Sequence, residues 1–122
     1  MRYSNAFGIN SSKVLLGTAY FGSLISEEES FKIMDRYCDL GGCHIDTARL
    51  YSDGMAEEII GKWVKSRKPE NVHISTKGGY PYDSELKNPR LSKDDISFDI
   101  GKSLKALGRE CIDFYRARRR TG

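Results

Sequence analysis

The sequence predicts an α/β fold in which short parallel strands alternate with crossover helices. Four runs of β-type residues are separated by segments with helical spacing, and this alternation is typical of parallel sheets, where each crossover needs a helix. The runs start at residues 13, 43, 71 and 111, so that they lie 30, 28 and 40 residues apart, as expected for βαβ units. Periodicity alone fits two architectures equally well, a small open α/β sheet and the first half of a (β/α)8 barrel.

The four predicted strands are short and rich in β-branched, aliphatic or aromatic residues. They span residues 13–17, 43–46, 71–76 and 111–115. The third βαβ unit is the longest because a loop rich in Gly and Pro, residues 78–89, follows the third strand.

Three amphipathic segments are predicted to form the crossover helices. The first follows Ser26, which begins a Ser-x-x-Glu capping box, and it ends at the glycine pair 41–42. The second runs from Met55 to about Ser66, and the third spans residues 92–107 and stops at a glycine. Their apolar stripes consist of Phe31, Met34, Tyr37 and Cys38, of Ile59, Ile60, Trp63 and Val64, and of Ile96, Ile100, Leu104 and Leu107.

Composition restricts the class of protein. The 122 residues are 39% hydrophobic and 30% charged, which predicts one globular domain rather than a disordered chain. No stretch approaches the roughly 18 apolar residues of a membrane span, and residues 1–10 lack the apolar core of a secretory signal. Cys38, Cys43 and Cys111 form no Cys-x-x-Cys pair, so we interpret all three as reduced, buried thiols of a cytoplasmic protein, with no metal site.

The positive net charge of +3 is concentrated at the carboxyl end of the chain. Residues 116–122 contain four Arg and no acidic residue, which leaves 16 basic against 17 acidic residues in the rest of the sequence. We interpret this segment as an Arg-rich tail. Nucleic-acid binding is not expected, because neither interleaved aromatic residues nor a base-reading motif accompanies the arginines.

Three residues suited to proton transfer are predicted to meet at the carboxyl edge of the sheet. Asp46 ends the second strand, Tyr51 lies in the loop after it, and Lys77 follows the third strand. An ammonium beside a buried phenol favours loss of the phenolic proton, which would make Tyr51 a proton donor with Lys77 as the tuning charge and Asp46 as its anchor. Spacing alone favours a structural alternative: a turn cap, a packed Tyr and a solvated Lys.

Other types of site find less support in the sequence. No strand is followed by the glycine pattern of a dinucleotide or phosphate loop, and no Ser lies in a Gly-x-Ser-x-Gly context. The two histidines, His44 and His73, fall inside predicted strands, where a His is usually a core residue with satisfied hydrogen bonds.

Three segments together carry a family pattern. The first reads His44-Ile45-Asp46-Thr47-Ala48-x-Leu50-Tyr51 and continues as Gly54-x-Ala56-Glu57-x-x-Ile60-Gly61. The second reads Ile74-Ser75-Thr76-Lys77. The third runs from Arg90-x-Ser92 through Ser103-Leu104-x-x-Leu107 to Ile112-Asp113-x-Tyr115. In this order and spacing they resemble the aldo-keto reductases over residues 13–115.

The resemblance implies the N-terminal half of a (β/α)8 barrel within residues 1–115, with about four parallel strands and three crossover helices. It also implies that a small aldehyde or ketone is reduced by NADPH, the reduced form of NADP, or alternatively by the reduced form of NAD. The family's catalytic Asp, Tyr and Lys fall on Asp46, Tyr51 and Lys77, with Tyr51 protonating the carbonyl oxygen. Gly17, Thr18 and Asp46 correspond to residues near the nicotinamide.

The sequence departs from the family pattern at its carboxyl end. The family places a catalytic His three residues after the position of Tyr115, whereas residue 118 is Arg. A complete barrel needs about 250 residues, so we interpret the chain as a truncated reductase. The Arg-rich composition after residue 115 indicates an interrupted reading frame, and a genuine basic tail is the alternative. We therefore expect weak cofactor binding, little or no turnover by this chain alone, and self-association through exposed sheet edges. The alternative is a non-catalytic α/β module that binds a protein or a polyanion.

Overall fold

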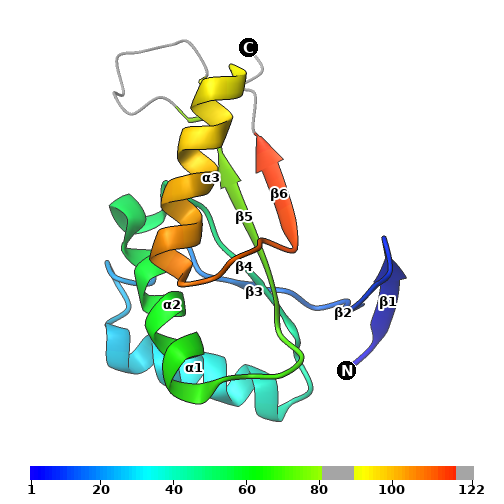
Figure 1. Cartoon of the computed structure of the whole chain (residues 1–122). Coiled ribbons are helices and arrows are strands. Elements are labelled where there is room, and N and C mark those ends of the chain that lie inside the picture. The colour runs from blue at the N-terminus through cyan, green and yellow to red at the C-terminus, as the bar shows by residue number, and fades with distance from the viewer. Residues whose placement is uncertain (81–89, 118–122) are drawn as a thin grey trace.

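The computed structural model describes residues 1–80 and 90–117, and its centre is a four-stranded parallel sheet (Figure 1). The strand order is β3-β4-β5-β6. The strands span Leu16–Gly17 (β3), His44–Asp46 (β4), His73–Gly78 (β5) and Phe114–Ala117 (β6). In this register Asp46 lies opposite Gly17 and Ser75, and Lys77 lies opposite Arg116.

Three helices connect the parallel strands, as the sequence predicts. They are α1 (Glu27–Asp39), α2 (Met55–Arg67) and α3 (Lys93–Leu107). The Ser26 side chain accepts a hydrogen bond from the Glu29 amide, which is one half of the predicted capping box, and Ser92 forms a reciprocal capping box with Asp95. Gly108 ends α3 with a left-handed φ of 63°. Figure 1 shows α3 beside β5, and α2 packs against α3.

The hydrophobic core lies between the sheet and these helices. Ile45 and Ile74 project from the middle of the sheet into this layer and are fully buried. The helices contribute fully buried side chains as well, namely Met34, Ile59, Ile60, Trp63 and Leu107. Since side chains alternate along a strand, the neighbours of Ile45 and Ile74 project from the opposite side of the sheet. We call the two sides the helix face and the polar face; the polar face carries His44, Asp46, Ser75, Lys77 and Arg116.

An N-terminal hairpin, which no pattern in the sequence predicts, precedes the parallel sheet. It pairs β1 (Tyr3–Ala6) with β2 (Ile9–Ser12) in antiparallel register. The turn residues Phe7 and Gly8 have positive φ values of 52° and 78°. A two-residue turn of this kind normally carries Asn-Gly or Asp-Gly, and the strands lack a clear apolar alternation, so the usual sequence signal is absent.

The first and last parallel strands differ from their predicted ranges. Only Leu16–Gly17 pairs as β3 within the run expected at residues 13–17. The last strand begins at Phe114 rather than at Cys111, because Asp113 bonds to β5 through its side chain as well as through its backbone. Its backbone amide donates to the carbonyl of Ile74, while its side chain accepts the Ile74 amide at 2.8 Å.

The burial predicted for the cysteines is wrong in part. Cys38, Cys43 and Cys111 are free thiols, but Cys111 is exposed and the other two are only partly buried. Within the described ranges, no helix combines the length and apolar character required to cross a bilayer. Most of the predicted Gly- and Pro-rich loop, residues 81–89, lies outside the described residues, as do residues 118–122.

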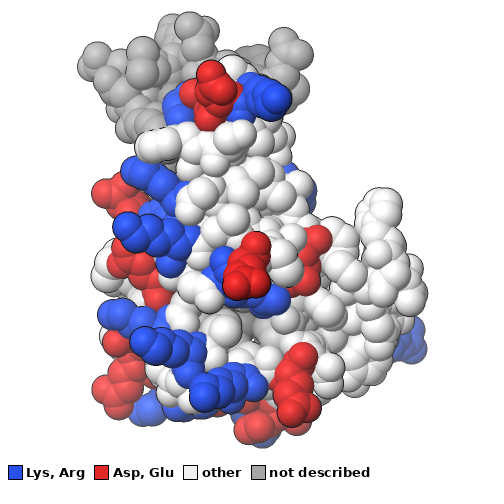
Figure 2. All heavy atoms as spheres, in the orientation of Figure 1, with Lys and Arg blue, Asp and Glu red and all other residues white. Residues whose placement is uncertain are grey.

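Figure 2 shows how charge is distributed over one side of the molecule. Basic and acidic side chains are intermixed along the left edge and the bottom of this side rather than forming a broad patch of one sign, and the centre of this side is largely uncharged. The ion pairs of the helices reflect this mixing, since Lys62 on α2 pairs with Glu27 on α1 at 2.9 Å and Arg67 pairs with Asp35 at 3.1 Å.

Candidate active site

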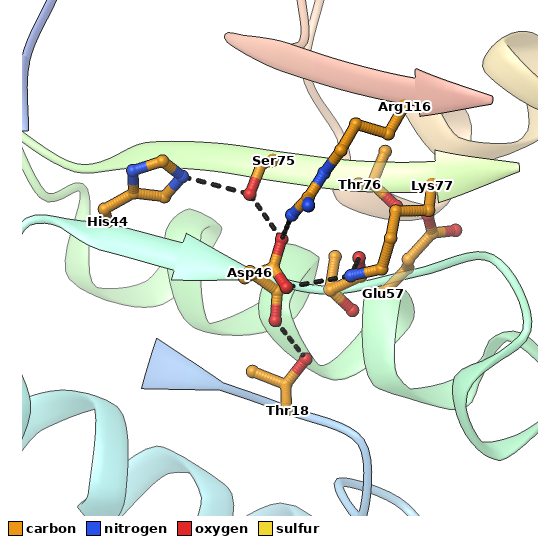
Figure 3. Close-up of polar contacts among 9 residues, drawn as sticks. Thr18, His44, Asp46, Glu57, Ser75, Thr76, Lys77 and Arg116 are labelled. Atoms are coloured by element: carbon orange, nitrogen blue, oxygen red, sulfur yellow. Dashed lines mark hydrogen bonds and ion pairs between the residues drawn. The ribbon is translucent and has the colours of Figure 1, made fainter. Parts of the chain in front are cut away.

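Asp46 is the centre of a polar cluster at the carboxyl edge of the sheet (Figure 3). Lys77 Nζ donates to Asp46 Oδ2 at 2.8 Å and to the Thr47 carbonyl at 3.0 Å. Ser75 Oγ donates to Asp46 Oδ1 at 2.6 Å. Ser75 and Lys77 are two residues apart on β5, so both side chains reach the same face as Asp46 on the adjacent strand β4.

The charges around Asp46 keep its carboxylate ionised. Burial acts to raise the pKa of Asp46, but the hydrogen bonds from Lys77 and Ser75 and the charges of Lys77 and Arg116 outweigh it, so that the pKa lies below its ordinary value. Arg116 Nη2 approaches Oδ1 to 3.2 Å from β6. Figure 3 shows the two cations reaching the carboxylate from different strands.

Tyr51 lies next to this ion pair. It begins the short 3-10 helix η1 (Tyr51–Gly54) and is half-buried. Lys77 Nζ lies 5.0 Å from the centre of the Tyr51 ring, within the range of a cation–π contact. The structure therefore brings the three predicted catalytic residues, Asp46, Tyr51 and Lys77, into one corner. Because Lys77 is buried, the interpretation of this residue as a solvated strand end is wrong.

The predicted cofactor residues lie beside Asp46 at the end of β3. Gly17 is the register partner of Asp46, and the Thr18 hydroxyl donates to the Asp46 carbonyl at 3.0 Å. A Cβ placed on Gly17 would have no heavy atom within 4 Å, so the end of β3 leaves open space.

A buried carboxylate on the helix face supports the strand that carries Lys77. Glu57 on α2 is fully buried and forms an ion pair with Arg49 at 2.8 Å. Its other oxygen accepts hydrogen bonds from Thr76 at 2.7 Å and from Ser103 at 2.6 Å. A buried charge is tolerated only when it is paired and hydrogen-bonded. The contact therefore fixes β5 against α2 and α3 from the side opposite Lys77.

Sequence reasoning does not identify Ser75 and Arg116 as members of this site. The signal for Ser75 is its position two residues before Lys77 in the same predicted strand. The sequence assigns Arg116 to the Arg-rich tail, whereas the structure places it in β6 opposite Lys77. The position that carries His in the family pattern, Arg118, lies outside the described residues.

His44 is a satisfied core residue, as its place in a strand predicts. The residue is 7% exposed, and its imidazole stacks on the Phe114 ring at 5.5 Å between centroids. Nδ1 lies 2.6 Å from Ser11 Oγ, and Nε2 lies 3.0 Å from Ser75 Oγ. His44 and Ser75 also line a cavity of about 270 Å³ on the polar face, with Leu15, Phe114, Tyr115 and Arg116.

Comparison with known proteins identifies the family of the chain. The model of the aldo/keto reductase family matches residues 13–119. The uncharacterized oxidoreductase YrpG of Bacillus subtilis is 33% identical over 124 residues, which cover 93% of this chain and 38% of the relative. The aldo-keto reductase yakc [NADP(+)] of Schizosaccharomyces pombe is 34% identical over 100 residues, which cover 80% of this chain and 29% of the relative. The chain thus spans less than two fifths of either relative.

Solved structures decide between the two architectures that the sequence leaves open. The aldo-keto reductase AKR11C1 from Bacillus halodurans, in its holo form, matches 90% of this chain with 37% of its own, at a TM-score of 0.76 and 28% identity. The thermostable aldo-keto reductase Tm1743, in complex with the inhibitor epalrestat, matches 94% of this chain with 42% of its own, also at 0.76 and 28%. These neighbours confirm the N-terminal half of a (β/α)8 barrel. The chain belongs to the aldo/keto reductase family.

Proposed function

We propose that the chain carries the proton-donating and cofactor-facing part of an NADPH-dependent oxidoreductase that reduces small aldehydes or ketones to alcohols. The observation that carries this proposal is the position of the Lys77 ammonium, 2.8 Å from Asp46 Oδ2 and 5.0 Å from the centre of the Tyr51 ring. The name of the Schizosaccharomyces pombe relative, aldo-keto reductase yakc [NADP(+)], supports the choice of cofactor; NAD is the alternative.

In the proposed reaction the carbonyl carbon gains a hydride and the carbonyl oxygen gains a proton, which together give the alcohol. The Tyr51 hydroxyl supplies the proton as a general acid. The Lys77 ammonium stabilises the negative charge that develops on the tyrosyl oxygen during proton transfer, because a fixed positive charge stabilises an anion that forms close to it. Asp46 holds Lys77 in place, since its Oδ2 and the Thr47 carbonyl accept two of the ammonium protons.

The residues at the end of β3 fit a nicotinamide ring. The space beside Gly17 is open, and the half-buried carboxylate of Asp46 lies next to it. We assign Gly17, Thr18 and Asp46 to this end of the cofactor. Reduced NADP supplies the hydride from its nicotinamide when it is bound.

We also propose that cofactor binding is weak and turnover slow when this chain acts alone. The chain matches only 29% to 38% of the length of the two relatives, and Arg118 occupies the position of the family's catalytic His.

A second copy of the chain is the partner that we propose for the sheet edges. Within the described residues, β3 pairs only with β4 and β6 only with β5, so each has one unpaired edge. We expect a mass above the 13.8 kDa of a monomer, rising with concentration, in light scattering after gel filtration. A monomer at every concentration would contradict this proposal.

Single-turnover deuterium transfer tests the proposed function directly. The chain is incubated with an aromatic aldehyde and with NADPH that carries deuterium at the transferable position, and the alcohol is analysed by mass spectrometry. We expect slow incorporation of deuterium that Tyr51→Phe abolishes. The matched control is Tyr3→Phe, because the Tyr3 hydroxyl donates to the Gly41 carbonyl ahead of the amino end of β4, whereas Asp46 lies at its carboxyl end. Equal incorporation in Tyr51→Phe, or none in the unmodified chain at saturating NADPH, would overturn the proposal.

A further inference from the structure

A line of hydrogen bonds crosses the polar face and ends on Asp46. It begins at Ser11 on β2, whose Oγ lies 2.6 Å from His44 Nδ1. It continues from His44 Nε2 to Ser75 Oγ at 3.0 Å and from Ser75 Oγ to Asp46 Oδ1 at 2.6 Å. Figure 3 shows its last two steps, which run from the imidazole to the carboxylate across β4 and β5. The proposed reaction steps, which involve Tyr51, Lys77 and Asp46, give no part to His44, Ser75 or Ser11.

The chemistry of the groups fixes the direction of each proton in this line. An ionised carboxylate only accepts, so the Ser75 hydroxyl donates its proton to Asp46 Oδ1. Ser75 Oγ then has only lone pairs left for His44, so the His44 Nε2–H is the donor of the 3.0 Å bond. In a neutral imidazole the other nitrogen, Nδ1, is then an acceptor, so the Ser11 hydroxyl donates to it at 2.6 Å in preference to the Ser12 carbonyl at 3.2 Å.

The surroundings of His44 keep its ring neutral. Burial lowers the pKa of His44 and is the largest influence; the charges of His73 and Arg116 act in the same direction, and those of Asp46 and Asp113 oppose it. These groups come from the three strands β4, β5 and β6 and from the residue before β6. The Phe114 ring stacks on the imidazole with an angle of 11° between the planes, which fixes the orientation of the ring.

We propose that His44 and Ser75 are positioning residues, which hold the Asp46 carboxylate in the orientation that presents Oδ2 to Lys77. Two donors compete for Oδ1: Ser75 at 2.6 Å and the more exposed Arg116 at 3.2 Å. Ser75 lies on the buried strand β5, and His44 fixes its hydroxyl so that the proton points at Oδ1. Without this donor, Arg116 alone bonds to Oδ1 and the carboxylate is free to rotate away from Lys77.

The consequence for catalysis rests on the proposed function, whereas the hydrogen-bond line itself does not. The line predicts one tautomer of His44, with the proton on Nε2. It also predicts that the titration midpoint of Asp46 depends on the Ser75 hydroxyl. Both are observable by NMR without cofactor or substrate. A failure of deuterium transfer would therefore leave this inference standing, and a wrong tautomer would overturn it while leaving the proposed function intact.

The experiment compares Ser75→Ala with Ser75→Thr, which restores the hydroxyl, and with the control Ser30→Ala. Ser30 is fully buried, and its hydroxyl bonds to the Ser26 carbonyl away from the site. Nitrogen-15 spectra report the His44 tautomer, and carbon-13 spectra of the side-chain carboxyl report the titration of Asp46. Backbone amide spectra confirm that each variant is folded.

We expect the unmodified chain to show His44 protonated on Nε2 and not on Nδ1. Ser75→Ala shifts the titration midpoint of Asp46 upward and mixes the His44 tautomers, Ser75→Thr restores both, and Ser30→Ala changes neither. If Ser75→Ala does not fold, His44→Phe serves instead: it keeps an aromatic ring against Phe114, removes the donor to Ser75, and shifts the Asp46 midpoint upward by less. A proton on Nδ1 in the unmodified chain, or an unchanged Asp46 midpoint in a folded variant, would overturn the proposal.

Discussion

The two faces of the central sheet differ in composition although they belong to the same strands. On the helix face, Ile45 and Ile74 are fully buried among the side chains of the helices. On the polar face, Asp46, Ser75 and Lys77 form a hydrogen-bonded cluster. Bulky branched residues usually dominate the interior of such barrels. The contrast shows that alternate residues of the same strands have different roles: those on the helix face stabilise the core, and those on the polar face form the candidate site.

The largest expected loss of stability comes from a substitution on the helix face. Trp63 is 1% exposed, and its indole N–H donates to Asp35 at 2.8 Å. Trp63→Ala should lower the free energy of unfolding by about 3–5 kcal/mol, because it removes buried surface and leaves a cavity. Urea titration followed by circular dichroism measures the change. The control Leu24→Ala, at a side chain that is 80% exposed, should stay within about 0.5 kcal/mol. Equal effects of the two variants would contradict the contrast between buried core and exposed surface.

A smaller effect arises on the polar face at acidic pH. The pKa of Asp46 in the folded chain lies below its ordinary value, so its contribution to stability is present above the unfolded pKa of about 4 and is lost as the pH falls through the folded pKa. The free energy of unfolding should therefore decrease below about pH 4, as measured by urea titration at several pH values.

Asp46→Asn should make this acid-induced decrease smaller but not remove it. The Arg67 and Trp63 hydrogen bonds also lower the pKa of Asp35, so the Asp35 carboxylate contributes in the same direction. An identical pH dependence in Asp46→Asn would show that the Asp46 cluster does not stabilise the folded chain.

Much of the fold follows from the sequence because its signals are local. The Ser-x-x-Asp box at Ser92 and the stop at Gly108 bound a helix that the structure confirms. The carboxyl ends of β4 and β5 place Asp46 and Lys77 together because parallel strands end at the same edge. The resemblance to the aldo-keto reductases then selects the barrel, which periodicity alone does not.

The parts that escape prediction depend on contacts distant in sequence. The hairpin Tyr3–Ser12 lacks an Asn-Gly turn and a regular apolar alternation. Arg116 acts on Asp46 only because β6 pairs with β5, and these two residues are 70 positions apart. The His44–Ser75 bond requires the register of β4 against β5, which no single strand encodes.

The smallest expected effect comes from removing Arg116. Its substitution distinguishes the contribution of Arg116 to the Asp46 cluster from that of Lys77. The Arg116 side chain is 63% exposed, so Arg116→Ala should change the free energy of unfolding by no more than about 0.5 kcal/mol. The Asp46 titration midpoint should rise slightly, because one positive charge is removed. Carbon-13 NMR measures this rise. A loss of stability as large as that of Trp63→Ala would show that the polar face is part of the structural core.

The most direct test of the central claim, that the polar face is the cofactor-facing site, is an NMR titration of the chain with NADPH. We predict that the backbone amide signals of Gly17, Thr18, Asp46 and Lys77 shift in a saturable manner, while those of Ile59 and Trp63 on the helix face do not. The contrary result is a shift confined to the lysine-lined groove between α2 and α3, at Lys62, Lys65 and Lys105. Such a result would mean that NADPH binds only as an anion on the outer surface, and it would contradict the account.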